Sequence, residues 1–542
     1  MKKIPKIYWL LLLAALLGGI GIFYNYGLVA GGTDEPLKVH SSLKFFRDFS
    51  LADQDSTFLP MVIILELPFV VLAFIFYLIL GIGDISQFKE LAIVDTYKFV
   101  PYFRLTTIVF GLLALYIFYK IAREIFQKER PALLASYFLA TSLLFVQQTH
   151  VAGAWIVQTM MILISLYYFL TLLKKEKWGW GVFIISALLI VFSIEIEVMG
   201  LIAALPLFLI YLRKRKEIKI SQEALKILLF FLTLGAGILL FAFLNPATFS
   251  EYFSLAGKPA VIGFGERFLG FWGILLFLEP LLLVSALGGL ILLYKRDKFL
   301  FKIFSSFLLV YYAVLGPLMG GVAERRLLPI IPALALPAAF FIEFLLSKYT
   351  AGNIKKFLSV LLLIFLINPL LFDRALVKKS SYIEAKNWII QNIPANASIW
   401  DMCWLELNEN KEILDEIKKN NQELLTTRRE YLLSHPYLLE SQKGYFVVRE
   451  NEIAERLGQE KFQYLVACFF DDEKTQKLLS GFEAGPKTEI YDSRAGFGDF
   501  RAVNLFKLVK FDDWENSGLK QLIKLPYHGP HFKIYQFFNK LI

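Results

Sequence analysis

Two adjacent carboxylates, Asp34 and Glu35, lie in residues 31–36 (GGTDEP), directly after the first long apolar run of the chain. A carboxylate at the edge of a membrane is partly removed from water, so its pKa rises and it becomes a better proton acceptor. Asp34 is therefore a candidate general base, with Glu35 placed to orient it. The same residues also suit a helix start, because Thr33 or Asp34 can cap the first turn and Pro36 fits within it.

Two further titratable residues, Lys38 and His40, follow on the same short predicted helix. Lys38 lies one turn beyond Asp34 and could pair with it. A histidine at such a position is more often a surface or interface residue than a catalytic one. Both residues are candidates for substrate binding.

Three arginines are candidates for holding an anionic group: Arg104, Arg325 and Arg326. The planar guanidinium group binds phosphate oxygens in pairs, most strongly where water is excluded. All three are predicted at helix ends on the same membrane face as Asp34. The alternative for any one of them is that its side chain extends to the lipid headgroups. The Arg325-Arg326 pair is the stronger candidate, because it lies among Pro and Gly residues where a binding site could open.

Three more polar residues interrupt apolar surroundings at the same predicted level. Glu195 and Glu197 lie in a predicted turn between two apolar runs, where acidic side chains are costly unless they are functional or paired with an arginine. His150 ends the third predicted helix, and a structural role is favoured for it over substrate binding. These three residues are also candidates for substrate binding.

No motif in the chain indicates a metal site or a cofactor. The closest approach to an Asp-x-Asp pair is Asp53-Gln54-Asp55, which is more typical of a solvated loop. There is no glycine-rich loop that could hold a phosphate group. The aromatic content of 16% is typical of residues that face lipid or the membrane interface, so the sequence predicts a metal-independent protein without a cofactor.

The composition identifies the elements that must position these residues. The chain has 542 residues, of which 57% are hydrophobic and only 19% are charged, and its mean hydropathy is +0.56. The apolar residues form runs that are long enough to span a bilayer as helices. The net charge of +10 comes largely from basic residues in short loops, which is the orientation signal of a membrane protein rather than a sign of nucleic-acid binding. The sequence therefore predicts a mainly α, multi-pass protein of the cell membrane.

About eleven spanning helices are predicted. They cover roughly residues 7–29, 104–122, 131–149, 153–173, 178–196, 198–212, 224–244, 270–294, 299–319, 327–347 and 357–372. The basic N-terminus is expected in the cytoplasm, and every second loop is basic. All basic loops fall on the cytoplasmic side only if the apolar segment 60–81 does not cross. That segment is therefore predicted to be interfacial or re-entrant, within an outer loop covering residues 30–103.

The composition changes after residue 373. Residues 374–542 mix charged and apolar residues, with helix-like stretches at 382–393 and 411–419 and strand-like runs at 444–448, 464–468 and 532–535. This part is predicted to be an extracytoplasmic α/β domain, and residues 1–373 to be the membrane domain. Its two cysteines, Cys403 and Cys468, could form a disulfide in an oxidising compartment or remain free thiols.

The order of these motifs resembles that of the GT-C-fold glycosyltransferases, which include the protein O-mannosyltransferases and the aminoarabinose transferases of lipid A. The resemblance rests on the Asp-Glu pair after the first helix and on the second helix, FRLTTIVFGLLALYIFYKIAREIF. Two later segments add to it, Leu244-Asn245-Pro246-Ala247 and residues 324–333 (ERRLLPIIPA). In the outer domain, YIEAKNWIIQNIP and GPHFKIY are similar to segments of some bacterial members.

This resemblance implies an enzyme that transfers a sugar from a polyprenyl-phosphate carrier to a lipid, glycan or protein acceptor outside the membrane, with inversion at the anomeric carbon. It implies that Asp34 acts as the base, supported by Glu35, and that Arg104, Arg325 and Arg326 bind the donor phosphate. Relatives often carry an acidic residue shortly after the third helix, where this chain has residues 150–155 (HVAGAW). This departure keeps open a catalytically inactive relative acting as a scaffold. A transporter or flippase is the other alternative.

The predicted orientation can be tested directly with a reporter fused after residue 100. The charge pattern predicts that this point lies outside the cytoplasm. An enzymatic reporter that is active only outside the cytoplasm should therefore be active in this fusion. A reporter that is active only in the cytoplasm is the control. If this reporter is active when fused after residue 100, the predicted orientation is wrong.

Overall fold

The computed structural model describes residues 5–22, 71, 74, 75, 90, 100–175, 178–214, 220–244, 264–312, 324–348, 352–377, 379–401, 405, 407–420, 427–440, 443–449, 463–469, 487–492, 527, 528 and 531–537. The chain divides into two compact units. The first contains the described residues of 5–20 and 102–370, and the second contains those of 371–542 together with a few earlier residues. The predicted boundary at residue 373 stays a prediction.

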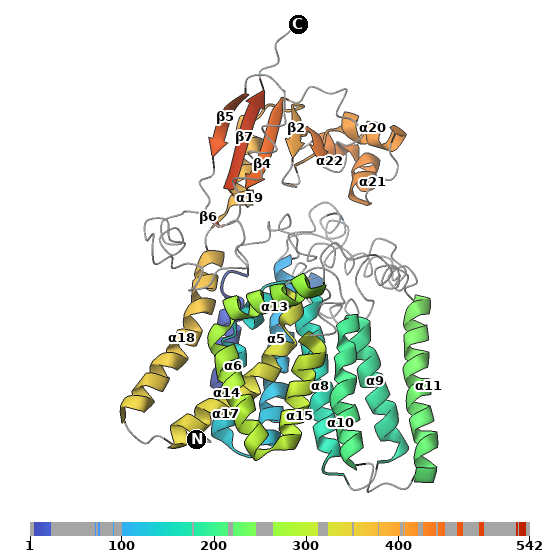
Figure 1. Cartoon of the computed structure of the whole chain (residues 1–542). Coiled ribbons are helices and arrows are strands. Elements are labelled where there is room, and N and C mark those ends of the chain that lie inside the picture. The colour runs from blue at the N-terminus through green and yellow to red at the C-terminus, as the bar shows by residue number, and fades with distance from the viewer. Residues whose placement is uncertain are drawn as a thin grey trace. The chain divides into compact units, whose positions relative to one another are not determined.

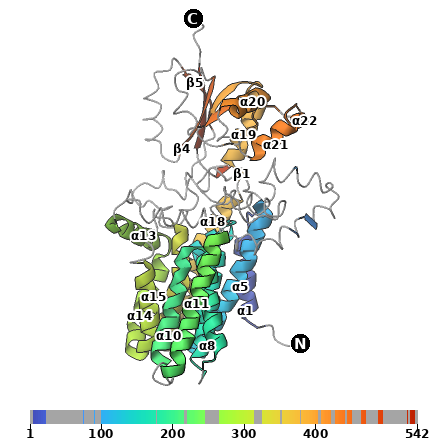
Figure 2. The same ribbon diagram turned by 90° about the vertical axis from the view of Figure 1, so that its right-hand side faces the viewer.

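The first unit is a bundle of apolar helices (Figures 1 and 2). Its longer helices are α1 (Ile7–Gly19), α5 (Val100–Phe126), α6 (Glu129–Ala140), α8 (Ala154–Leu172), α9 (Trp180–Ile196), α10 (Ala204–Lys214), α11 (Ile220–Leu244), α13 (Phe264–Leu278), α14 (Pro280–Arg296), α15 (Lys298–Val310), α17 (Ile330–Lys348) and α18 (Gly352–Leu376). Short helical segments lie at α7 (Leu143–Thr149), η2 (Val198–Ala203) and η5 (Glu324–Leu327).

Within the described residues, three helices are long and apolar enough to cross a membrane: 103–126, 154–172 and 330–348. Two bent helix pairs also qualify if each pair is counted as a single span. Several other apolar helices are shorter, including α1 and α9. These are the helices of an integral membrane protein, and the total of about eleven spans stays a prediction.

Two of the predicted spans are not straight helices. The span predicted at 131–149 bends by 59° between α6 and α7. The span predicted at 270–294 is wrong as a single helix, because it breaks at Glu279 and the two parts differ in direction by 105°. Pro280 has no backbone N–H and disfavours helical geometry in the residue before it, so α13 ends there and α14 begins anew. Figure 1 shows α13 lying across one end of the bundle.

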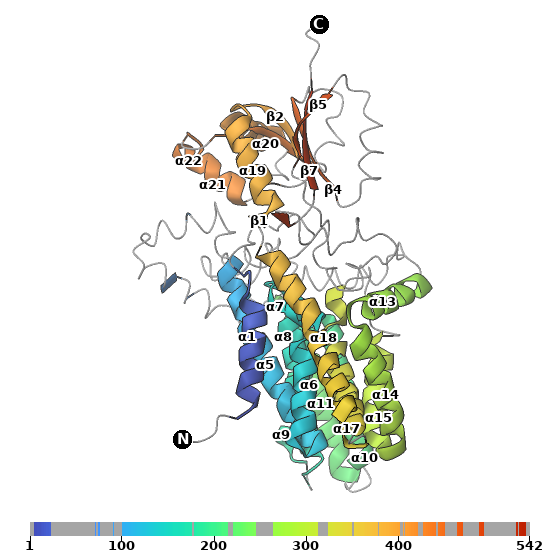
Figure 3. The ribbon, with the colours of Figure 1, turned by 90° about the vertical axis from the view of Figure 1, so that its left-hand side faces the viewer.

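The basic helix ends come together at one end of the bundle, as the charge pattern predicts. Lys174 at the end of α8 pairs with Glu124 on α5, and Arg130 on α6 pairs with Glu343 on α17 at 3.3 Å. The guanidinium group of Arg296 at the end of α14 lies 5.3 Å from the ring centre of Phe344 on α17. Helices far apart in the sequence therefore end at the same level, which Figure 3 also shows.

Helices α14 and α17 approach each other closely. A Cβ atom added at Gly289 would lie 1.8 Å from the carbonyl oxygen of Pro337, and one added at Gly288 would lie 2.9 Å from the ring of Phe341. Small residues let membrane helices approach closely, and dispersion contacts between them then replace the missing hydrophobic driving force. Gly289 therefore determines how closely α14 packs against α17.

The second unit contains a five-stranded sheet with the order β3-β2-β4-β7-β5. Its strands are β2 (Ser398–Asp401), β3 (Phe446–Arg449), β4 (Tyr464–Phe469), β5 (Lys487–Asp492) and β7 (His531–Phe537). β2 pairs in parallel with β3 and β4, and β7 is antiparallel to β4 and β5. A short parallel pair, β1 (Lys379–Ser380) with β6 (Tyr527–His528), completes the strands of the described residues.

Helix α19 (Ser381–Asn392) covers one face of this sheet, where its Ala385 and Ile389 belong to the same apolar core as Ile399 on β2. Burial raises the pKa of Tyr445 to about 12, so its hydroxyl stays protonated and donates to the carbonyl oxygen of Ile389 at 3.2 Å. The segments predicted as strands at 444–448, 464–468 and 532–535 overlap β3, β4 and β7, each of which extends beyond the predicted bounds. The location of this unit outside the membrane stays a prediction.

A smaller core joins three further helices of the second unit, α20 (Lys411–Asn420), α21 (Thr427–Ser434) and α22 (Pro436–Glu440). Beside it, Arg429 donates to both carboxylate oxygens of Glu409, at 2.6 and 3.1 Å. Both side chains are almost fully buried. A buried, bidentate pair of this kind satisfies both charged groups, although its removal as a pair need not be destabilising.

The Gly289→Ala variant tests the helix packing. The added methyl group would force α14 away from α17, and overpacking of this kind costs roughly 1–3 kcal/mol. The thermal midpoint of the purified protein in detergent should fall. Gly235→Ala on α11 is the matched control, because no atom lies within 4 Å of the added Cβ there. An unchanged midpoint for Gly289→Ala would contradict the close approach.

Candidate functional site

Four of the predicted site residues, Asp34, Glu35, Lys38 and His40, lie outside the described residues. Their roles stay predictions. The other six, Arg104, His150, Glu195, Glu197, Arg325 and Arg326, are described and all belong to the first unit.

These six residues lie at or near helix ends opposite the basic ends of the bundle. Arg104 is in the second turn of α5, His150 follows α7, and Glu197 ends α9. The arginine pair forms the middle half of η5, which packs against α7 and α13. The structure thus gathers side chains from distant parts of the sequence at one level of the bundle, which we call the site end.

His150 fastens α7 to α1. Its Nε2 lies 2.8 Å from the carbonyl oxygen of Ile20, and its Nδ1 lies 2.8 Å from that of Val146. Because a carbonyl oxygen only accepts, both contacts become hydrogen bonds in the imidazolium form, which carries a proton on each nitrogen. The side chain is 5% exposed. These contacts give His150 a structural role, and its part in substrate binding stays a prediction.

Arg104 is buried in the bundle, with 4% of its surface exposed. Such burial disagrees with a side chain that extends to the lipid headgroups. One turn later, the Thr107 hydroxyl lies 2.7 Å from the carbonyl oxygen of Thr149 and so joins α5 to the end of α7. A Cβ added at Gly111 on α5 would lie 2.8 Å from the Thr149 side chain. Arg104 therefore lies one turn before a closely packed contact between α5 and the end of α7.

Glu197 lies in the turn from α9 into η2, whereas Glu195 lies within α9. The backbone carbonyl of Glu197 accepts from Nε2 of Gln158 on α8 at 3.0 Å and from the backbone N–H of Gly200 at 2.7 Å. A Cβ at Gly200 would lie 1.9 Å from the carbonyl oxygen of Ser193, so only glycine fits this turn. The turn that presents Glu197 is therefore rigidly defined.

Tyr311, directly after α15, links this turn to η5. Its hydroxyl donates to the carbonyl oxygen of Arg326 at 2.5 Å and lies 3.7 Å from the sulfur of Met199. The structure thus brings the turn after Glu197, through Met199, and the arginine pair, through the Arg326 carbonyl, to the same buried tyrosine.

Sequence reasoning missed Tyr311 and Gln158 as parts of this arrangement. Tyr311 is one of 25 tyrosines, and Gln158 lies in an apolar helix with no neighbouring motif. Both bind backbone carbonyl groups, which leave no trace in the sequence. The sequence did offer one signal for Gln158, which is its place in an apolar run long enough to span a membrane. A side-chain amide in such a helix needs hydrogen-bond partners.

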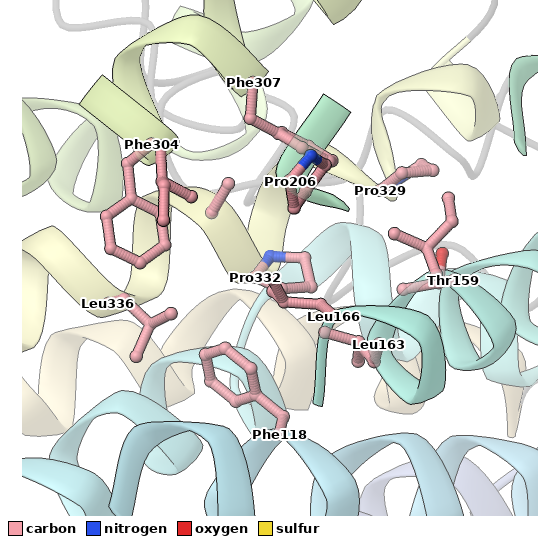
Figure 4. A pocket seen from close by; sticks show the side chains of 13 residues that line it. Phe118, Thr159, Leu163, Leu166, Pro206, Phe304, Phe307, Pro329, Pro332 and Leu336 are labelled. Atoms are coloured by element: carbon pink, nitrogen blue, oxygen red, sulfur yellow. The ribbon is translucent and has the colours of Figure 1, made fainter. Parts of the chain in front are cut away.

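A small apolar cavity of about 20 Å³ lies deeper in the bundle. Phe118, Thr159, Pro206, Phe304 and Pro332 are among its lining residues, which come from five different helices (Figure 4). This volume is about that of a single water molecule, and apolar cavities of this kind stay dry. The cavity is a packing defect and not a site for a sugar or a phosphate.

Residues 100–241 match the family of dolichyl-phosphate-mannose-protein mannosyltransferases. No curated protein matches the chain. Among solved structures, ArnT from Cupriavidus metallidurans bound to undecaprenyl phosphate is 10% identical with a TM-score of 0.48, covering 90% of this chain and 96% of that chain. The archaeal oligosaccharyltransferase AglB from Archaeoglobus fulgidus, in complex with an inhibitory peptide and a dolichol-phosphate, is 13% identical with a TM-score of 0.43. This similarity covers 85% of this chain and 70% of that chain.

The family match confirms the resemblance inferred from the second helix. It takes in Arg104, His150, Glu195 and Glu197, and it leaves Asp34 and the arginine pair outside the matched residues.

The Tyr311→Phe variant tests the link between α15 and η5. Without the hydroxyl, the buried carbonyl group of Arg326 loses this donor, which should lower stability by roughly 1 kcal/mol. The thermal midpoint in detergent measures the effect. Tyr294→Phe on exposed α14 surface is the matched control and should leave the midpoint unchanged. Equal midpoints for both variants would show that the Tyr311 hydroxyl contributes nothing.

Proposed function

We propose that this protein is a membrane glycosyltransferase that moves a sugar from a polyprenyl-phosphate donor to an acceptor at the site end of the bundle. The observation that carries the proposal is the match of residues 100–241 to mannosyltransferases whose family name specifies a lipid-phosphate sugar. The acceptor is a lipid, a glycan or a protein. The reaction inverts the anomeric carbon and does not use a metal ion.

The chemistry requires a base for the acceptor and cations for the leaving phosphate. Asp34 takes the proton of the acceptor hydroxyl, and the acceptor oxygen forms a bond to the anomeric carbon. The bond between that carbon and the phosphate oxygen breaks on the opposite side, and the lipid phosphate leaves with the electron pair. A base that is correctly positioned typically contributes about 10²- to 10⁴-fold in rate.

Arg104, Arg325 and Arg326 bind the departing phosphate in this proposal. Arginine binds phosphate through paired hydrogen bonds, and such bonds are strong at a site that excludes water. The position of Arg326 next to Tyr311, and of η5 against α7 and α13, supports this role because it fixes the arginine pair at the site end. Glu35 orients Asp34, and Glu197 is positioned to contact a polar group of the substrate.

The Asp34→Asn variant tests the assigned base. Purified protein is given radiolabelled polyprenyl-phosphate sugars and a membrane extract as the source of acceptors. The variant should lose at least roughly 100-fold in transfer rate, because an amide cannot take the proton. Asp53→Asn, in the predicted solvated loop, is the matched control and should transfer normally.

Two results would contradict the proposal in different ways. Equal transfer by Asp34→Asn and the unsubstituted protein would remove Asp34 from the mechanism and leave the reaction intact. No transfer from any donor by the unsubstituted protein would instead favour a transporter or an inactive scaffold.

A further inference from the structure

Two bent helix pairs in the described part of the bundle meet at one carboxylate. Glu279 lies at the break between α13 and α14, and its Oε1 accepts from the Ser142 hydroxyl at 2.6 Å. The same oxygen accepts from the backbone N–H of Leu144 at 3.1 Å. Ser142 and Leu144 lie at the break between α6 and α7, which is 135 or more residues away in the sequence. A single side chain therefore joins two interrupted membrane helices.

Glu279 is buried, with 5% of its surface exposed. An acidic side chain inside an apolar bundle is costly, so its presence there calls for a partner and a purpose. Its partners are the otherwise unsatisfied donors at the beginning of α7. Ser142 is part of the same network, since its hydroxyl oxygen also accepts from the backbone N–H of Phe145 at 3.3 Å. A side chain without an acceptor at position 279 would leave the Leu144 N–H unsatisfied in a buried place.

The elements that Glu279 joins are the same two that hold the arginine pair. Segment η5 packs against both α7 and α13. Its third fixed point is the hydrogen bond from Tyr311 to the carbonyl of Arg326. The relative position of α7 and α13 therefore determines the place of Arg325 and Arg326.

We propose that Glu279 is a positioning residue for the phosphate-binding arginines: by fastening α7 to the break between α13 and α14, it sets the surfaces that hold η5. The inference rests on the proposed function for the identity of the ligand, which is the phosphate group of a polyprenyl phosphate. The fastening itself does not depend on any reaction. Glu279 does not touch the substrate in this proposal.

A distance measurement tests the fastening without any activity. Spin labels are attached at Gly19→Cys on α1, which packs against α7, and at Gly273→Cys on α13, after Cys403 and Cys468 have been replaced by Ser. No atom lies within 4 Å of an added Cβ at either position, so labels are tolerated there. Double electron–electron resonance then gives the distribution of distances between the labels on α1 and α13.

Four variants are compared in this labelled protein. Glu279→Leu should shift or broaden the distance distribution, and Ser142→Ala, a milder change, should do so less. Glu279→Gln keeps an acceptor oxygen of the same reach and should restore the original distribution. Ser136→Ala removes a hydroxyl that bonds only within α6, and it is the matched control. Identical distributions for Glu279→Leu and the unsubstituted protein would overturn the inference.

A binding measurement tests the link to the arginines. Arg326→Ala and Glu279→Leu should each weaken the binding of polyprenyl phosphate roughly tenfold, and Glu279→Gln should bind normally. Because both changes act on one site, the double variant should bind no more weakly than either single variant. Additive losses would show that Glu279 affects binding independently of Arg326, and would overturn the link.

A failure of the proposed function can be distinguished from a failure of this inference. If the unsubstituted protein binds no polyprenyl phosphate and transfers no sugar, the proposed function is wrong. The distance distributions still decide whether Glu279 fastens the two breaks. If phosphate binding behaves as expected and no sugar is transferred, the binding role stands and the assigned reaction is wrong.

Discussion

Within a bilayer, every backbone N–H and C=O group must find its partner inside the protein, and this constraint decides where a membrane helix can break. Helices of the bundle break at Ser142 and at Glu279. The first break provides hydrogen-bond donors, and the second provides an acceptor for them. The helix that begins after Ser142 has unsatisfied donors, and the carboxylate at Glu279 is a strong acceptor. The two interruptions are therefore possible because they occur side by side.

The charged residues of the bundle divide into two groups with different physical roles. At the basic end, Lys174, Arg130 and Arg296 make contacts that are largely exposed, and exposed ion pairs contribute little to stability. Basic residues at such helix ends are the signal on which the predicted orientation of the chain rests. At the site end, Arg104 and Glu279 are buried, so their presence has a cost that neighbouring polar groups must offset.

Much of the helical architecture could be predicted, because apolar runs of spanning length and the basic loops between them are direct consequences of the bilayer. The site end could be predicted in part. Arg104, Glu197 and Arg326 were identified as charged residues at helix ends, and the structure places them at one level. Asp34 and Glu35 lie outside the described residues, so the position of the assigned base rests on sequence.

Other features could not be predicted, for identifiable reasons. Glu279-Pro280 is compatible with a gentle kink and with a break of 105°, and proline chemistry alone does not choose between them. His150 and Tyr311 contact the backbone carbonyl groups of Ile20 and Arg326, respectively. Every residue has such a carbonyl group, so the sequence does not mark these two. Only the folded chain shows which carbonyl a side chain reaches. Sequence patterns therefore identify the costly charged residues more readily than the neutral residues that position them.

Recognition of backbone carbonyls has a consequence for the chemistry at the site end. Thr107, Gln158 and Tyr311 each bind a carbonyl group through a neutral donor. Such contacts place helix ends accurately without introducing additional charge beside Arg326 or Glu197. Under the proposed function, a phosphate group bound there would be attracted by Arg326 and repelled by Glu197, and interactions between charges are strongest where solvent and other ions are excluded. The neutral framework thus fixes the arginines without adding a further charge that would weaken their attraction for that phosphate group.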